Sequence, residues 1–233
     1  MPNWVRNTIC IKGNENDVMA LINDALANSN EKSFELDHFT EAVDHLVANG
    51  KRKWLSNEEG KITLENGLTL RTFLPIPDTY LLYDTTNHSE LYPDAVKEQK
   101  EKYGIVGWYD YNCATLGCKW DCDLDFIEFT HNEDSKTCYI QLFCETPWSP
   151  PEEWIKTLIE KYHLEICILT IDEGYMFFFY ECVNDGDGRD CLGDFEELWN
   201  DETIDDEDYD FKCEELEDKI DMEFHDFVHK KLL

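Results

Sequence analysis

Long apolar runs are missing from this sequence. No stretch approaches the roughly 18 apolar residues that mark a membrane-spanning helix. The first residues, MPNWVRNTICIKG, alternate like a strand and lack the charged segment and apolar core of a signal peptide. We therefore expect a soluble, cytoplasmic protein.

Basic side chains are also scarce. The 233 residues include 20 Lys and Arg against 52 Asp and Glu, which gives a formal net charge of -32. Nucleic-acid phosphates and anionic membrane leaflets would both repel such a surface. The composition predicts neither direct nucleic-acid binding nor membrane binding. It favours a protein partner with a basic surface, toward which the chain would be steered.

Familiar catalytic motifs are absent as well. The sequence has no glycine-rich phosphate loop, no G-x-S-x-G and no H-E-x-x-H. We therefore expect no enzymatic activity and no cofactor. The ten cysteines are expected to be free thiols that pack as small apolar groups, because the cytosol is reducing.

A metal site is the alternative to free, buried thiols. Cys113, Cys118 and Cys122 have a loose zinc-like spacing, but no C-x2-C pair accompanies them. The oxygen-rich run 184–190 resembles a calcium loop, yet Arg189 occupies a ligand position and the expected Glu is missing. We predict no metal, with buried thiols and a solvated turn as the simpler explanations.

The hydrophobic pattern predicts an α+β fold. Residues 4–12 alternate like a strand, and a helix with Val18 and Ile22 on its apolar face follows. Strands are predicted at 119–130, 137–146, 164–171 and 175–182. A helix between the second and third of these is expected to begin with a capping box formed by Ser149 and Glu152.

This order is that of a ferredoxin-like split βαβ core with one added hairpin strand. The core would carry an α/β insertion at about 30–118, in which KITLENGLTLRTF (61–73) is predicted to form a hairpin that turns at Asn66-Gly67. We expect two regions: a ferredoxin-like domain over 1–183 and an acidic, partly helical C-terminal extension over 184–233.

Four short motifs carry a family resemblance. They are MPNW at the start, YGIVGWYDYNCATLGCKWD at 103–121, FCETPWSPPEEW at 143–154 and IDEGYMF at 171–177. In this order they resemble the YubB-type ferredoxin-like family of phages, plasmids and other mobile elements. The resemblance covers about 1–183 and implies a ferredoxin-like core, but no activity. The chain departs from the family pattern at Leu116, where an aromatic residue is usual.

The C-terminal extension, which is the last 50 residues of the chain, carries 20 acidic and 5 basic residues, a net charge of -15. An apolar stripe at Cys213, Leu216, Ile220, Phe224, Phe227 and Val228 has helical spacing. We expect a helix that docks on the body or on a partner with its acidic face outward. If helical, the extension carries one acidic group per roughly 3.7 Å of axis, close to the phosphate spacing of about 3.4 Å along one DNA strand. A purely solubilising role is the alternative to mimicry.

A second candidate site is an aromatic cluster with a few charges. Aromatic rings with convergent charges suit a small ligand or a stacked base. A simpler interpretation is that the rings seal the insertion against the sheet. The possible pocket consists of Trp108, Tyr109, Asp110, Lys119, Trp120, Asp121 and Trp148.

Together these features predict a non-catalytic acidic protein of a phage or mobile element that acts in the host cytosol. It would inhibit a host nucleic-acid-handling defence protein, of the restriction or CRISPR type, by imitating nucleic acid. The alternative is a small-molecule-binding or enzymatic domain with its site at the Trp108/Trp120 cluster. The predicted partner-binding residues are Asp201, Glu202, Asp205, Asp206, Glu207, Asp208, Asp210, Glu214 and Glu217.

Overall fold

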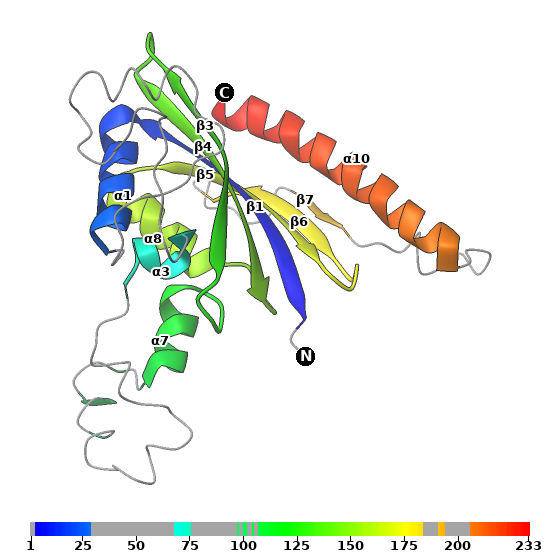
Figure 1. The fold of residues 1–233 in the computed structure, drawn as a ribbon, viewed down its shortest axis with the longest axis horizontal. Helices are drawn as coiled ribbons and strands as arrows, with labels where there is room; N and C mark the ends of the chain where they lie inside the picture. The colour runs from blue at the N-terminus through cyan, green and yellow to red at the C-terminus, as the bar shows by residue number, and fades with distance from the viewer. Residues whose placement is uncertain are drawn as a thin grey trace, which may run out of the picture.

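Seven strands among the residues that the structure describes form one antiparallel sheet at the centre of the protein (Figure 1). The computed structural model describes residues 3–28, 68–75, 107–183, 191–193 and 206–233, together with residues 97, 100, 101 and 104. The strand order is β2-β3-β4-β1-β5-β6-β7, and each neighbouring pair is antiparallel. The strands are β1 (Trp4–Asn14), β2 (Leu68–Thr69), β3 (Asp123–Asn132), β4 (Thr137–Pro147), β5 (Glu165–Asp172), β6 (Phe178–Cys182) and β7 (Cys191–Gly193).

Helices lie on both faces of the sheet, so the architecture is mixed α and β, as the sequence predicts at the level of class. The described helices are α1 (Glu15–Asn28), α3 (Leu70–Phe73), α7 (Gly107–Thr115), α8 (Glu152–Tyr162) and α10 (Asp206–Leu232). Asn14 ends β1 and caps α1, because its Oδ1 accepts hydrogen bonds from the backbone N–H groups of Asn16 and Asp17.

Alternation along the strands divides the apolar residues between two clusters. Ile9 and Ile11 of β1 pack with α1, α3 and α8, and Trp154 of α8 is fully buried there. Cys10 of the same strand, with Leu169 of β5, belongs to the second cluster, under α10. In Figure 1, α10 (red) crosses the face of the sheet opposite α1 and α8. Within the described residues, no helix is both long and apolar enough to cross a membrane.

Four local predictions are wrong. The strand predicted at 175–182 begins only at Phe178, after a turn in which Tyr175 has a φ of +53°. The predicted capping box of α8 does not form: the helix begins after Pro151 without a side-chain cap, and the Ser149 hydroxyl instead donates to the Gly117 carbonyl at 2.7 Å. Residues 70–73 of the predicted hairpin form α3, because Thr69 and Thr72 make a reciprocal capping box. Strand β3 begins at Asp123 rather than at residue 119, since 116–120 form a turn in which Gly117 has a φ of +84°.

Much of the predicted insertion, including the Asn66-Gly67 turn, lies outside the described residues. The described parts of the insertion are β2, α3, α7 and a few single residues. Helix α3 packs against α1 and α7 packs against α8. These contacts place α3 and α7 on the side of the sheet that α1 and α8 cover.

Candidate functional site

The long helix α10 docks on the sheet through one apolar stripe. Ile220, Phe224, Val228 and Leu232 are each at most 4% exposed. They pack with residues of β1, β5 and β6, and Tyr180 of β6 lies 4.9 Å from the Phe227 ring, centroid to centroid. The predicted stripe is therefore the face of α10 that packs against the sheet.

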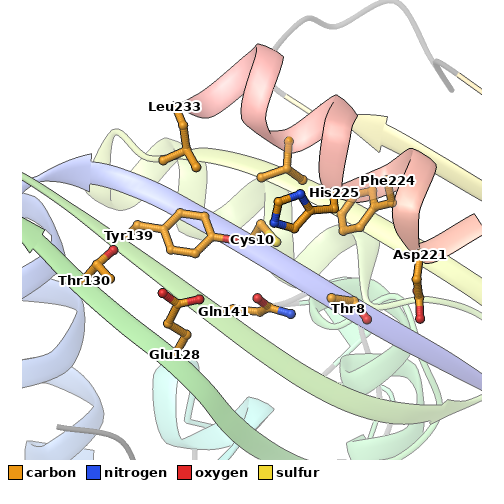
Figure 2. Close-up of a pocket in the computed structure, with 11 residues that line it drawn as sticks. Thr8, Cys10, Glu128, Thr130, Tyr139, Gln141, Asp221, Phe224, His225 and Leu233 are labelled. Carbon is orange, nitrogen blue, oxygen red and sulfur yellow. Dashed lines mark hydrogen bonds between the residues drawn. The ribbon is translucent and has the colours of Figure 1, made fainter. Parts of the chain in front are cut away.

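A groove of about 490 Å³ remains between α10 and the strands β1, β3 and β4 (Figure 2). Its walls come from segments far apart in the chain, so no local sequence pattern predicts it. The sheet contributes Thr8, Cys10, Glu128, Tyr139 and Gln141, and the helix contributes Asp221, Phe224, His225 and Val228.

The groove environment shifts several pKa values. Burial raises the pKa of Cys10 to about 11, and the charge of Glu128 adds to the rise. Burial also raises the pKa of Tyr139, whose hydroxyl donates a 3.1 Å hydrogen bond to Cys10 Sγ. The pKa of Asp221 is raised by burial first and by the charge of Glu217 next. The thiol and the phenol are therefore neutral at physiological pH and add no charge to this groove.

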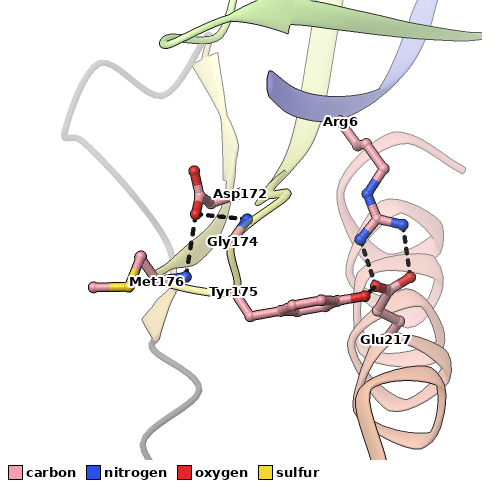
Figure 3. Close-up of polar contacts among 6 residues, drawn as sticks. All are labelled: Arg6, Asp172, Gly174, Tyr175, Met176 and Glu217. Carbon is pink, nitrogen blue, oxygen red and sulfur yellow. Dashed lines mark hydrogen bonds and ion pairs between the residues drawn. The ribbon is translucent and has the colours of Figure 1, made fainter. Parts of the chain in front are cut away.

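A polar clamp fixes α10 beside the start of β1 (Figure 3). Arg6 Nη1 donates to Glu217 Oε2 at 2.8 Å, and Arg6 Nη2 and the Tyr175 hydroxyl both donate to Glu217 Oε1. Burial would raise the pKa of Glu217, but the hydrogen bonds from Arg6 and Tyr175 outweigh burial and hold this pKa below its ordinary value. Burial and the same carboxylate raise the pKa of Tyr175.

The clamp gives Glu217 a role different from the predicted one. Its carboxylate is occupied by Arg6 and Tyr175 within the chain, whereas the predicted partner-binding role requires a free outward charge. Glu217 lies beside the buried stripe, between Cys213 and Ile220, and this position brings it to the sheet. Periodicity could assign it to the border of the stripe, but only the fold brings Arg6 to it from 211 residues away.

The outer face of α10 is strongly acidic. Five carboxylates between residues 214 and 226 are exposed and lie outside the groove: Glu214, Glu215, Asp218, Glu223 and Asp226. At about 1.5 Å of rise per residue they span about 18 Å, or one carboxylate per about 4.5 Å. Two large apolar side chains lie exposed on the same helix, Phe211 at 62% and Met222 at 71%.

The other predicted acidic residues fall partly or wholly outside the described part of the chain. Asp201, Glu202 and Asp205 precede α10 and are not described. The backbones of Asp206, Glu207, Asp208 and Asp210 form the first turns of α10, but the structure does not describe their side chains. Acidic residues at a helix N-terminus complement its dipole. The last turn of α10 carries the opposite bias, with His229, Lys230 and Lys231.

The structure gathers most of the predicted aromatic cluster around one lysine. The Lys119 ammonium lies 4.6 Å from the Trp120 ring centre, 4.9 Å from that of Trp148 and 5.7 Å from that of Tyr109. Trp4, which is not among the residues predicted for this cluster, lies 6.2 Å from Trp120, centroid to centroid. Such ring-to-ammonium distances are typical of cation–π contacts. The Trp108 side chain lies outside the described part.

The two carboxylates of the predicted cluster do not work as a pair. Asp110 is exposed on α7. Asp121 Oδ1 accepts a 3.0 Å hydrogen bond from the backbone N–H of Arg71, and burial raises the pKa of Asp121. Among the described contacts none joins these two groups, so the arrangement offers no acid–base pair.

The three cysteines considered for metal binding occupy different environments. Cys113 is exposed on α7, while Cys118 and Cys122 are buried, with their thiols 3.3 Å and 3.5 Å from the carbonyl oxygen of Trp120. A hydrogen bond with Cys122, and then burial, raise the pKa of Cys118. Among the described residues no group of three or more His, Cys, Asp or Glu is placed to hold a metal ion. The run 184–190 is outside that set.

Comparison with known proteins finds a distant structural similarity. No family model matches the chain, and no curated protein shows significant sequence similarity to it. A crystal structure of a protein api92 from Yersinia pseudotuberculosis, of family DUF1281, is similar over 84% of this chain and 98% of that chain. The identity is 12% and the TM-score is 0.37, and a likeness of this strength carries no argument about function.

Proposed function

We propose that this protein is a non-catalytic acidic binding protein of a phage or other mobile element. In this proposal, the outer face of α10 occupies the basic nucleic-acid-binding surface of a host defence protein of the restriction or CRISPR type, in the host cytosol. The observation that carries the proposal is the row of five exposed carboxylates between residues 214 and 226 that lie outside the groove. Their mean axial spacing of about 4.5 Å is of the same order as that of phosphates along one DNA strand, about 3.4 Å.

The exposed apolar residues favour protein binding over a purely solubilising role. Phe211 and Met222 would gain little from exposure on a helix whose only task is to carry charge. Protein interfaces combine a few apolar anchors with charged rims, and the anchors supply most of the binding energy. Charge complementarity then adds speed of association and choice of partner.

A rigid mount supports the same proposal. The stripe under α10 and the clamp of Glu217 with Arg6 and Tyr175 hold the helix in place before any partner arrives. A preorganised surface loses less conformational entropy on binding than a free tail does. The docked helix can therefore present its outer carboxylates in a fixed arrangement.

The alternative site at the aromatic cluster has weaker support. The position that a cationic ligand would occupy among Tyr109, Trp120 and Trp148 holds the ammonium of Lys119. A ligand would first have to displace this side chain. The contacts fit a structural role for Lys119 at the junction of α7 with the sheet.

We also infer that the centre of the fold is the ferredoxin-like split βαβ core suggested by the family resemblance. In support, the chain order β1-α1-β3-β4-α8-β5 and the sheet order β3-β4-β1-β5 follow that arrangement. The proposed division at residue 183 separates this core from α10. One apolar cluster nevertheless contains residues of both segments.

Displacement of DNA from purified defence nucleases tests the function. Fluorescence anisotropy of a labelled duplex would be followed for a panel of Cas9-type effectors and restriction enzymes, at low and high salt. We expect displacement that weakens with salt, and a loss of about fivefold in the double variant Glu215→Asn and Asp218→Asn, since exposed ion pairs contribute about 0.2–1 kcal/mol each.

The matched control is the double variant Asp134→Asn and Glu160→Gln, which removes two exposed acids of the body and leaves α10 unchanged. It should displace DNA as well as the parent protein does. A separate variant, Phe211→Ala, tests the apolar anchor. Failure to displace DNA from any enzyme of the panel, or equal losses in both double variants, would overturn the proposal.

A further inference from the structure

We propose that the groove between α10 and strands β1, β3 and β4 is a binding site for a small organic cation with an apolar body, such as an arylalkylamine. This site is separate from the outer face of the helix, and it uses a different part of the molecule. Its volume of about 490 Å³ lies within the range of small-molecule pockets, about 300–1,000 Å³.

Charge defines one half of the ligand. Glu128 enters the groove from β3 and Asp221 from α10, so carboxylates stand on opposite walls (Figure 2). Glu128 lies near Cys10 and Tyr139, and its charge adds to the rise that burial causes in the pKa values of both groups. No Lys or Arg is among the lining residues. The negative charge of this groove would therefore attract an ammonium group.

Unused hydrogen-bonding groups point to the same place. Within the described part of the chain, the half-buried side chains of Thr8 and Gln141 have no hydrogen-bond partner, and both line the groove. Half-buried polar groups without protein partners are available to a ligand or to water. An amine donates hydrogen bonds, and both the Thr hydroxyl and the Gln carbonyl accept them.

The other half of the ligand follows from the apolar wall. Tyr139 is half-buried and Leu233 is 69% exposed, and both line the groove together with Phe224 and Val228 of the buried cluster. An inorganic cation or a fully hydrated diamine has no apolar group that could contact this wall. An aromatic or alkyl body fits it, because apolar surface gains free energy by leaving water. A single amine attached to one ring combines both requirements.

Tryptamine is a suitable probe, because it joins an indole ring to one primary ammonium group. Its binding to the full ¹⁵N-labelled chain would be followed by amide NMR shifts. We expect saturable one-to-one binding, with the largest shifts in β3, β4 and residues 221–228. Indole-3-acetate, which has the same ring and a negative charge, should not bind.

Matched variants separate a site from general attraction to an acidic protein. The double variant Glu128→Gln and Asp221→Asn should weaken tryptamine binding about tenfold, since charge-assisted hydrogen bonds are lost. The control Glu214→Gln and Asp218→Asn removes equal charge from the outer face and should change binding by less than about twofold. Melting temperatures of both proteins verify folding.

Three results would overturn the proposal: shifts that never saturate, equal weakening in the two double variants, or equal binding of indole-3-acetate. The control variant carries changes in the face assigned to partner binding. The groove and the outer face can therefore fail independently.

Discussion

Replacement of Glu217 by Ala should loosen the whole of α10, because one carboxylate joins the helix to two other segments of the chain. The substitution removes two hydrogen bonds from Arg6 and one from Tyr175. Hydrogen bonds to charged groups contribute about 1.5–3 kcal/mol each. The Arg6 and Glu217 side chains are still 30% and 20% exposed, so solvent screening lowers their sum, and we expect a loss of about 2 kcal/mol.

Urea unfolding followed by tryptophan fluorescence measures this loss. With a slope of about 3 kcal/mol per molar urea for a chain of this size, the midpoint should fall by about 0.7 M. Glu214→Ala is the matched control, because Glu214 lies one turn earlier on the exposed side of the same helix. Its effect should stay within about 0.5 kcal/mol.

The pH dependence gives an independent check with a definite sign. The folded-state pKa of Glu217 is held below its ordinary value of 4.5, by hydrogen bonds that outweigh burial. Its contribution to stability is therefore complete above pH 4.5 and is lost as the pH falls through the folded-state pKa. The difference between the parent protein and Glu217→Ala should shrink below pH 4.5. A difference that is no larger than that of Glu214→Ala, or that persists unchanged at pH 3, would show that the clamp does not hold α10 on the sheet.

Three further predictions concern other parts of the fold. Gly117→Ala should lower the melting temperature by several degrees, because Gly117 has a φ of +84° and a Cβ there would lie 3.0 Å from the Glu152 backbone nitrogen. Phe224→Ala should cost about 3 kcal/mol in urea unfolding, because the ring is 4% exposed under α10. With Ellman's reagent at pH 8, Cys113 should react in the native state. Cys10, which is buried and has a pKa of about 11, should react only after unfolding.

Local patterns were sufficient for most of the described elements. The alternation in residues 4–12 and the helical spacing around Trp154 both correspond to elements of the structure, β1 and α8. Both signals arise because one face of each element is buried, which leaves a period in the sequence. The misplaced start of β3 and the missing cap at Ser149 share another cause. The Ser149 hydroxyl donates a hydrogen bond to the Gly117 carbonyl, 32 residues earlier in the chain. A local sequence pattern cannot predict such a contact.

In the candidate sites, too, local features could be predicted from the sequence, whereas contacts between distant segments could not. The stripe of α10 could be predicted, because its period is local. The clamp could not, since Arg6 and Tyr175 reach Glu217 from distant segments. The groove was equally hidden, because it exists only where a diagonal helix leaves part of β3 and β4 uncovered. Among the aromatic residues, the sequence predicted a cluster that contains Trp120 and Trp148. Trp4 joins this cluster only because β1 of the folded sheet brings it beside Trp120.

The two proposed surfaces depend differently on the docking of α10, and an experiment can distinguish them. The outer carboxylates belong to the helix alone, so a detached but helical α10 would still carry them. The groove requires both walls, Asp221 on the helix and Glu128 on the sheet. Weakening the clamp through Arg6→Ala should therefore impair tryptamine binding more strongly than DNA displacement. Equal losses of both would mean that the partner recognises the docked helix together with the sheet beneath it, rather than the row of charges by itself.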